Sequence, residues 1–151
     1  MAQVTTRLNQ HWSKERPGNF AEIVDTALND SAKTLTVPSG KIWELYSIYV
    51  DYTCSADAGN RQLNLTMQTT NAAVIAYIHA LNVMIADAHE YFHFGVNIGS
   101  VTEPIATFHC LPLPAVALPA GSVIRIMDIA TIAGAADDML IRALVNVHDI
   151  N

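Results

Sequence analysis

The strongest constraint on the fold of this chain is a two-residue alternation of apolar and polar side chains. Residues 60–70 read NRQLNLTMQTT, so that Leu63, Leu65 and Met67 share one face and polar side chains occupy the other. Side chains of a β-strand point alternately to its two faces, whereas an α-helix repeats every ~3.6 residues. The pattern therefore predicts a half-buried strand here.

A longer run, Lys41–Thr53, is rich in the aromatic and β-branched residues that favour strands. Its alternation changes face near Ser47, because Trp43 and Leu45 lie on one parity and Ile48 lies on the other. A β-bulge inserts one extra residue into a strand and produces such a switch. We therefore expect one long strand that is bulged near Ser47.

Further β-rich segments are separated by glycine, proline and Asx residues, at residues 73–78, 88–94, 122–129 and 139–148. Two of the turns have similar sequences, at residues 37–45 (VPSGKIWEL) and 118–126 (LPAGSVIRI). Both segments read apolar residue, proline, small residue, glycine and polar residue, followed by a strand-like run. Proline followed by glycine suits a tight turn that leads into a strand. Two hairpins of the same construction suit the two Greek keys of a jelly roll. We predict an all-β, jelly-roll-like antiparallel β-sandwich.

The start of the chain differs from the rest in charge. Residues 1–19 hold Arg7, Lys14 and Arg16 against one acid, Glu15, which is three minus one, or +2. The remainder holds five basic and thirteen acidic residues, or −8. We interpret residues 1–32 as an N-terminal arm, with one or two helical turns at residues 20–28, ahead of a sandwich domain at residues 33–151. Arg7, Lys14 and Arg16 are expected to contact a partner, either an acidic capsid surface or a neighbouring copy of the chain. The alternative is that the arm is a frayed terminus without a partner.

Composition excludes several classes of protein. Apolar residues make up 51% and charged residues 15%, which is the opposite of a disordered chain. A net charge of −6 argues against direct nucleic-acid binding. Uninterrupted apolar runs of about 20 residues, which a membrane span needs, are missing, and the start lacks the apolar core of a secretory signal. We expect synthesis in a cytoplasm and no membrane partner.

Residues 89–93 spell HExxH, the signature of zinc hydrolases. On a helix, His89 and His93 share a face and Glu90 serves as the general base. Here the alternation around them indicates a strand, on which positions four apart lie ~13 Å from each other, too far for one metal. We therefore expect no metal, no cofactor and no catalytic residues, and a zinc hydrolase is only a third interpretation.

Four segments together resemble small virion proteins of tailed bacteriophages. They are residues 36–53 (TVPSGKIWELYSIYVDYT), 59–67 (GNRQLNLTM), 118–130 (LPAGSVIRIMDIA) and 137–145 (DDMLIRALV). The resemblance is to the jelly-roll cement or decoration proteins on the outside of a phage capsid. It implies a non-enzymatic structural protein of the virion, with the major capsid protein or other virion proteins as partners. The position on the particle stays open between a capsid axis, a head-fibre base and the neck.

The alternative is a carbohydrate- or ligand-binding β-sandwich module. Such modules expose aromatic side chains on one face, and Trp43, Tyr46, Tyr49 and Tyr52 are candidates for that role. Ordinary core packing is the competing explanation for these four residues. The two functions predict different behaviour in purification. A structural virion protein should co-purify with particles, whereas a carbohydrate-binding module should be retained on a glycan resin.

The last strand, residues 139–148, carries an apolar row on one face and Leu140, Arg142 and Leu144 on the other. Two leucines beside an arginine suit a contact in which a partner's acid neutralises the arginine. The sequence thus predicts a homo-oligomer, a dimer or a trimer, with Leu140, Arg142 and Leu144 in its interface. The alternative is that the arm of the same chain covers this face.

Overall fold

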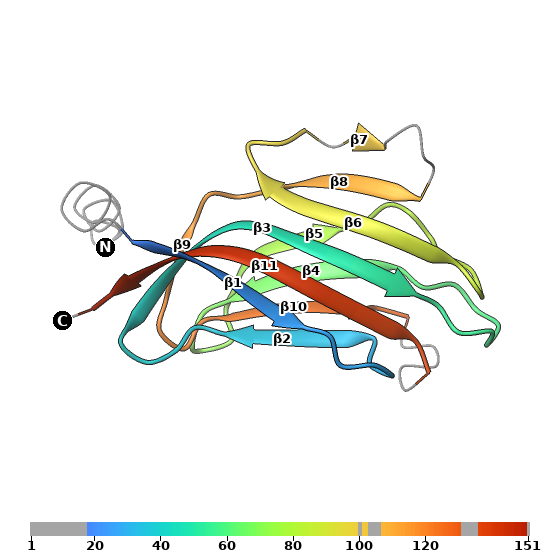
Figure 1. The fold of residues 1–151 in the computed structure, drawn as a ribbon, viewed down its shortest axis with the longest axis horizontal. Coiled ribbons are helices and arrows are strands. Elements are labelled where there is room, and N and C mark those ends of the chain that lie inside the picture. Colours follow the sequence, from blue (N-terminus) through green and yellow to red (C-terminus); the bar gives the residue numbers. More distant parts are fainter. Residues whose placement is uncertain (1–17, 100, 103–106, 131–135, 151) are drawn as a thin grey trace.

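The computed structural model describes residues 18–99, 101–102, 107–130 and 136–150. In these residues the chain forms strands and no helix, and the strands build two sheets packed face to face (Figure 1). The described part of the chain therefore also holds no helix that could span a membrane. The prediction of an all-β, jelly-roll-like sandwich is confirmed.

The larger sheet orders its strands β1, β11, β3, β6, β8, β7, and a short strand, β9, also pairs with β3 (Figure 1). Their bounds are β1 Asn19–Asp25, β11 Asp138–Asp149, β3 Lys41–Thr53, β6 His89–Val96, β8 Phe108–Leu113, β7 Val101–Thr102 and β9 Ala117–Pro119. The smaller sheet has the order β2 (Ala32–Thr36), β10 (Val123–Asp128), β4 (Leu63–Gln68) and β5 (Val74–His79). Neighbouring strands are antiparallel except β6 and β8, which pair in parallel.

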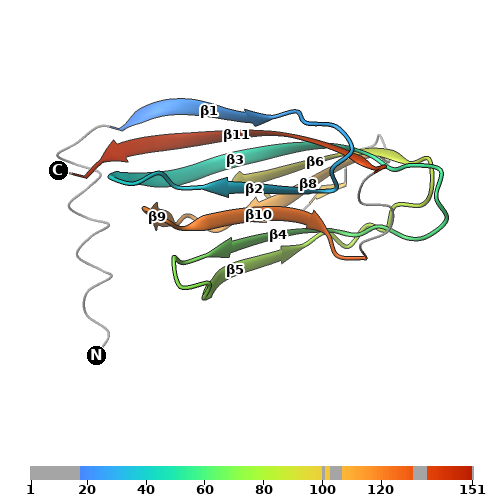
Figure 2. The ribbon, with the colours of Figure 1, turned by 90° about the horizontal axis from the view of Figure 1, so that it is seen from below.

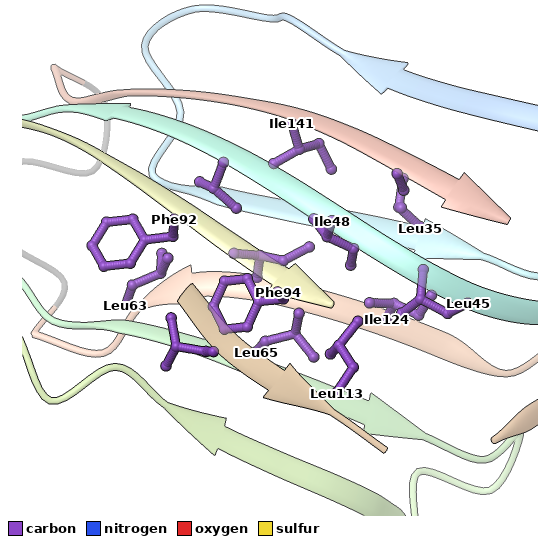
Figure 3. Packing of buried hydrophobic residues seen from close by; sticks show 14 of the residues in the cluster. Leu35, Leu45, Ile48, Leu63, Leu65, Phe92, Phe94, Leu113, Ile124 and Ile141 are labelled. Atoms are coloured by element: carbon purple, nitrogen blue, oxygen red, sulfur yellow. The ribbon is translucent and has the colours of Figure 1, made fainter. Parts of the chain in front are cut away.

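The core lies between the two sheets and is filled by the inward-facing rows of both (Figure 3). Ile48, Phe92 and Ile141 enter it from the larger sheet, and Leu65 and Ile124 enter it from the smaller one. Leu63, Leu65 and Met67 are fully buried, as their alternation predicts. The opposite face of β4 is not solvated, however, because Asn64 and Thr66 are also buried.

The expected bulge is present in β3. Leu144 of β11 lies opposite Ser47, and the next residue, Val145, lies opposite Leu45, so that Tyr46 is the inserted residue. The insertion brings Leu45 and Ile48 to the same buried side although they differ in parity. It also turns Tyr46 out towards solvent.

The two proline-glycine turns are built alike and lie side by side. Gly40 and Gly121 have φ angles of 74° and 79°, which glycine adopts without steric cost. The first turn links β2 to β3 and the second links β9 to β10. β2 pairs with β10, and β3 pairs with β9. The two turns with similar sequences are therefore neighbours at one end of the sandwich.

The helical turns expected at residues 20–28 are wrong. Residues 19–25 instead form β1, which runs antiparallel to β11 with Phe20 opposite Asn146 and Asp25 opposite Ile141. Ala21 and Ile23 pack against the core while Phe20 is exposed, so this short segment fits a period of two as well as a helical one. Backbone pairing with the long strand β11 decides in favour of the strand. The larger sheet therefore begins at Asn19, ahead of Lys33.

Candidate functional site

An exposed apolar strip follows the free edge of the smaller sheet. β5 pairs with β4 on one side, and on its other side it has no partner among the described strands (Figure 2). The strip comprises exposed side chains of β5 and of the segment that follows it, namely Val74, Ile75, Tyr77, Leu81, Val83 and Ile85. Leu81 is 88% exposed and Tyr77 is 58% exposed.

The composition around the strip makes it unusual for a sheet edge. Residues 62–86 contain no Asp, Glu, Lys or Arg, in a chain whose net charge is −6. Proteins normally protect edge strands with charged residues or proline, because an unprotected edge pairs with other chains. A series of exposed apolar side chains along one sheet edge is typical of an interaction site. The strip is therefore the strongest candidate for a functional surface in this structure.

A second candidate is a row of aromatic side chains on the outer face of the larger sheet. Tyr49, Tyr91 and Phe108 come from β3, β6 and β8. The Tyr49 and Tyr91 rings stack with centroids 6.2 Å apart, and the Phe108 ring lies 6.5 Å from that of Tyr49. Burial, followed by the nearby Asp51 carboxylate, raises the pKa of Tyr49 above its ordinary value of 10. The rings are half-buried, and Arg142 and Asp51 lie beside them in the sheet, opposite Tyr49 and Tyr91 respectively.

A shallow cavity of about 350 Å³ lies near Tyr46, the residue inserted at the bulge. Its lining includes Glu44, Tyr46, Val96, Asn97 and Val116. The Glu44 carboxylate accepts a hydrogen bond from the Asn146 side chain over 3.1 Å, and the Phe20 ring packs edge-on against Tyr46. Polar groups beside an exposed ring are features that a small polar ligand uses.

Of the four aromatic residues that the sequence suggested for ligand binding, two are buried and two lie at the surface. Trp43 and Tyr52 are buried in the core, as the packing explanation predicts. Tyr46 is exposed and Tyr49 is half-buried, and both face outwards from β3. Tyr91 and Phe108, which complete the aromatic row, could not be associated with Tyr49 from the sequence, because β6 and β8 become neighbours only through long-range pairing.

The HExxH segment forms part of strand β6 and not of a helix. His89 and His93 therefore flank Tyr91 on the outer face, and the His89 ring lies 2.7 Å from the Asp51 carboxylate. Glu90 points to the opposite face, where its Oε2 lies 2.8 Å from Nε2 of His109 and also contacts the side chain of Asn82. The glutamate and the two histidines consequently do not share one site. Within the described residues, three or more His, Cys, Asp or Glu side chains do not gather into a metal-binding group.

The predicted interface residues Leu140, Arg142 and Leu144 lie on the outer face of β11. Leu140 is half-buried and Leu144 is 39% exposed. Arg142 is exposed and pairs with Glu22 of β1, over 3.3 Å. β1 lies beside β11 in the sheet and does not cover this face. The role of the three residues in an oligomer stays a prediction, as does the partner role of Arg7, Lys14 and Arg16, which lie outside the described residues.

A buried ionic network that the sequence did not predict stabilises one end of the sandwich. The side chains of Arg61 and Asp137 are both fully buried, and Arg61 Nε lies 3.1 Å from Asp137 Oδ2. The Tyr52 hydroxyl donates to Asp137 over 3.0 Å, and the Ser55 amide donates to it over 2.8 Å. Arg61 also donates to the carbonyl of Asp57. The network is structural, because these groups satisfy one another.

Comparisons with known proteins do not place the chain in a family. No protein-family model matches it, and no curated protein matches it. Among solved structures it is similar to a chain of the T13 IBDV viral particle, at 10% identity and a TM-score of 0.37, over 89% of this chain and 36% of that one. This chain thus spans about a third of the viral chain's length.

Two other solved structures are similar at the same level. The CBM22-1 xylan-binding domain of Paenibacillus barcinonensis Xyn10C has 9% identity and a TM-score of 0.33, over 90% of this chain and 86% of that one. The Agl-KA catalytic domain has 10% identity and a TM-score of 0.33, over 89% and 26%. Viral, carbohydrate-binding and catalytic proteins are therefore all among the similar structures, and likeness at this level assigns neither family nor function.

Proposed function

We propose that this chain is a non-enzymatic structural protein of a virion, which binds the outside of a phage capsid and cements or decorates the major capsid subunits. The observation that carries the proposal is the apolar strip along β5 and residues 81–85. A chain that works alone in water gains nothing from a long uncharged apolar edge, whereas a lattice protein buries such an edge against its neighbours. The resemblance of the strand segments to phage decoration proteins supports the same function.

Two further features agree with a role in assembly. Lysine, which protein interfaces disfavour, occurs only at Lys14, Lys33 and Lys41. Of these, Lys33 is buried and its ammonium group is held by Asp25, over 3.0 Å, so it contributes little to the surface. The basic arm with Arg7, Lys14 and Arg16 remains the proposed contact with an acidic capsid surface.

The test is co-sedimentation with particles from which the protein has been removed. We expect wild type to bind, and the double variant Leu81→Asp with Ile85→Asp to lose most of its binding, since two carboxylates would be desolvated in the contact. Leu28→Asp is the matched control, because Leu28 is 60% exposed and precedes β2, the strand at the opposite edge of the smaller sheet from β5. Equal binding of wild type and the double variant would contradict the proposal.

The second candidate function is a carbohydrate- or ligand-binding module. It is favoured by the aromatic row of Tyr49, Tyr91 and Phe108 and by the cavity beside Tyr46. Retention of wild type on a glycan resin, with loss of retention in Tyr91→Ala or Tyr46→Ala, would favour this function over the structural one.

A further inference from the structure

We propose that β5 pairs with β5 of a second copy of this chain, antiparallel and across a two-fold axis, so that the two smaller sheets become one continuous sheet. The inference rests on the proposed function only in taking the apolar strip as a contact surface. It assigns the β5 part of the strip to the second copy, and it leaves Leu81, Val83 and Ile85 for the capsid.

The backbone of β5 offers the hydrogen-bonding groups that such pairing needs. The Ala80 amide donates to the Leu63 carbonyl over 2.9 Å, and Asn64 lies opposite His79 in the ladder. Bonded and non-bonded pairs alternate in an antiparallel ladder, so Ile78 bonds to β4 while Tyr77 and His79 direct their N–H and C=O groups to the open edge. A strand with outward groups on alternate residues is complementary to a two-fold copy of itself.

The side chains of β5 do nothing to prevent that pairing. The strand holds no proline, lysine or carboxylate, and its exposed Val74, Ile75 and Tyr77 have high β propensity. β1, which is an edge strand of the larger sheet, differs from β5 in this respect. It carries Glu22 and Asp25, charges of the kind that block edge-to-edge association.

The lack of charge around β5 permits a second copy as the occupant. Two chains of net charge −6 repel each other over most of their surfaces. The uncharged run of residues 62–86 is where they approach without bringing like charges together. A two-fold contact also presents the same patch from both sides, so an apolar strip meets an apolar strip. Tyr77, near the middle of β5, is placed opposite Tyr77 of the second copy.

The first experiment measures mass by light scattering after size-exclusion chromatography. We expect wild type to have the mass of two chains, and Tyr77→Lys to have the mass of one with an unchanged circular dichroism spectrum. Phe20→Lys is the matched control, because Phe20 is an aromatic residue of the outer strand β1 with 62% exposure. It should keep the mass of two chains. Wild type with the mass of one chain at every concentration would overturn the inference.

The second experiment does not depend on a charged variant. In a hydrogen-bonded antiparallel pair the Cα atoms lie ~5.5 Å apart, which is within the disulfide range. Tyr77→Cys in a Cys110→Ser background should therefore form a covalent dimer on mild oxidation, while Phe20→Cys in the same background should not. Equal cross-linking of the two variants would count against pairing through β5.

Two further results separate this inference from others. If Leu140→Asp with Leu144→Asp lowers the mass and Tyr77→Lys does not, the contact between copies lies on the outer face of β11 and the β5 pairing is wrong. If wild type is a monomer but Leu81→Asp with Ile85→Asp abolishes particle binding, the inference fails while the proposed function stands. A β5 dimer that binds no particles supports the inference and contradicts the proposed function.

Discussion

Gly121 donates its backbone N–H to the carbonyl oxygen of Val37 over 2.9 Å, which joins the two proline-glycine turns directly. Val37 in turn donates its N–H to the carbonyl of Ser122 over 2.9 Å. The segments that echo each other in the sequence are therefore hydrogen-bonded neighbours in space. Both turns carry the chain from one sheet to the other, so this contact ties the two sheets together at one end of the sandwich.

This contact predicts different costs for two similar substitutions. Gly40→Ala and Gly121→Ala both force a side chain into positive φ, which costs about 1–2 kcal/mol of unfolding free energy. A Cβ at Gly40 meets nothing within 4 Å, whereas a Cβ at Gly121 comes within 3.0 Å of the Thr70 side chain. We expect Gly121→Ala to be the more destabilising in urea unfolding. Gly99→Ala, in open space without a positive φ, is the control and should be nearly neutral; equal losses for all three variants would contradict the prediction.

The Arg61–Asp137 pair predicts a large loss of stability when one partner is removed. Arg61→Ala leaves the Asp137 carboxylate buried without its main partner, and breaking a buried pair in this way costs about 3–5 kcal/mol. Arg125 of β10 is exposed, so Arg125→Ala should stay within about 0.5 kcal/mol of wild type. Chemical unfolding of both variants tests the prediction, which fails if the two variants are equally stable.

The same network predicts a loss of stability in acid. Burial alone raises the pKa of Asp137, but hydrogen bonds from Arg61 and Ser55 outweigh it and hold the pKa below the ordinary value of 3.8. A carboxyl whose pKa is lower in the folded state stabilises the fold above its unfolded pKa, and that contribution is lost as the pH falls through the folded pKa. The stability difference between wild type and Asp137→Asn should therefore be constant above about pH 5 and should shrink below about pH 4.

Unfolding in urea across this pH range measures that difference. The control is Asp57→Asn, because the Asp57 side chain is exposed. Its difference from wild type should be small throughout. A difference for Asp137→Asn that is unchanged from neutral pH to pH 3 would show that the carboxylate does not stabilise the fold.

The geometry of β6 predicts that the HExxH segment binds no stoichiometric zinc. Tyr91 separates His89 from His93 along the strand, and Glu90 faces the other way, towards His109. Elemental analysis of protein purified without a chelator checks this. About one zinc per chain, lost in His93→Ala, would show that the prediction is wrong.

The charge of the arm predicts that its deletion affects binding more than folding. Removing residues 2–17 leaves β1 intact, since that strand begins at Asn19. We expect a nearly unchanged melting temperature and weaker particle binding, with the larger loss at low salt, where charges are least screened. An undeleted chain with Arg7, Lys14 and Arg16 changed to glutamine should show the same loss. Unchanged particle binding after deletion would refute the role of the arm.

The sequence alone predicted the features that depend on neighbouring residues. The alternation at Leu63, Leu65 and Met67 indicated a strand with one core face, and the parity change near Ser47 indicated the bulge that the structure has at Tyr46. The proline-glycine pairs indicated both turns. These features are local because side-chain direction in a strand and the φ angles of a turn are set within a few residues.

Only the tertiary structure decided which strands lie next to one another and which stand at an edge. It made residues 19–25 a strand beside β11, it joined Tyr49, Tyr91 and Phe108 into one row, and it left β5 without a partner on its outer side among the described strands. It also buried Asn64 and Thr66, although their alternation indicated a solvated face. The sequence by itself determined the strands with a clear alternation, such as β3, β4 and β11, and their core-facing rows, whereas the neighbours of these strands follow from backbone pairing between segments tens of residues apart. That pairing has no local signature, because every strand offers the same N–H and C=O groups.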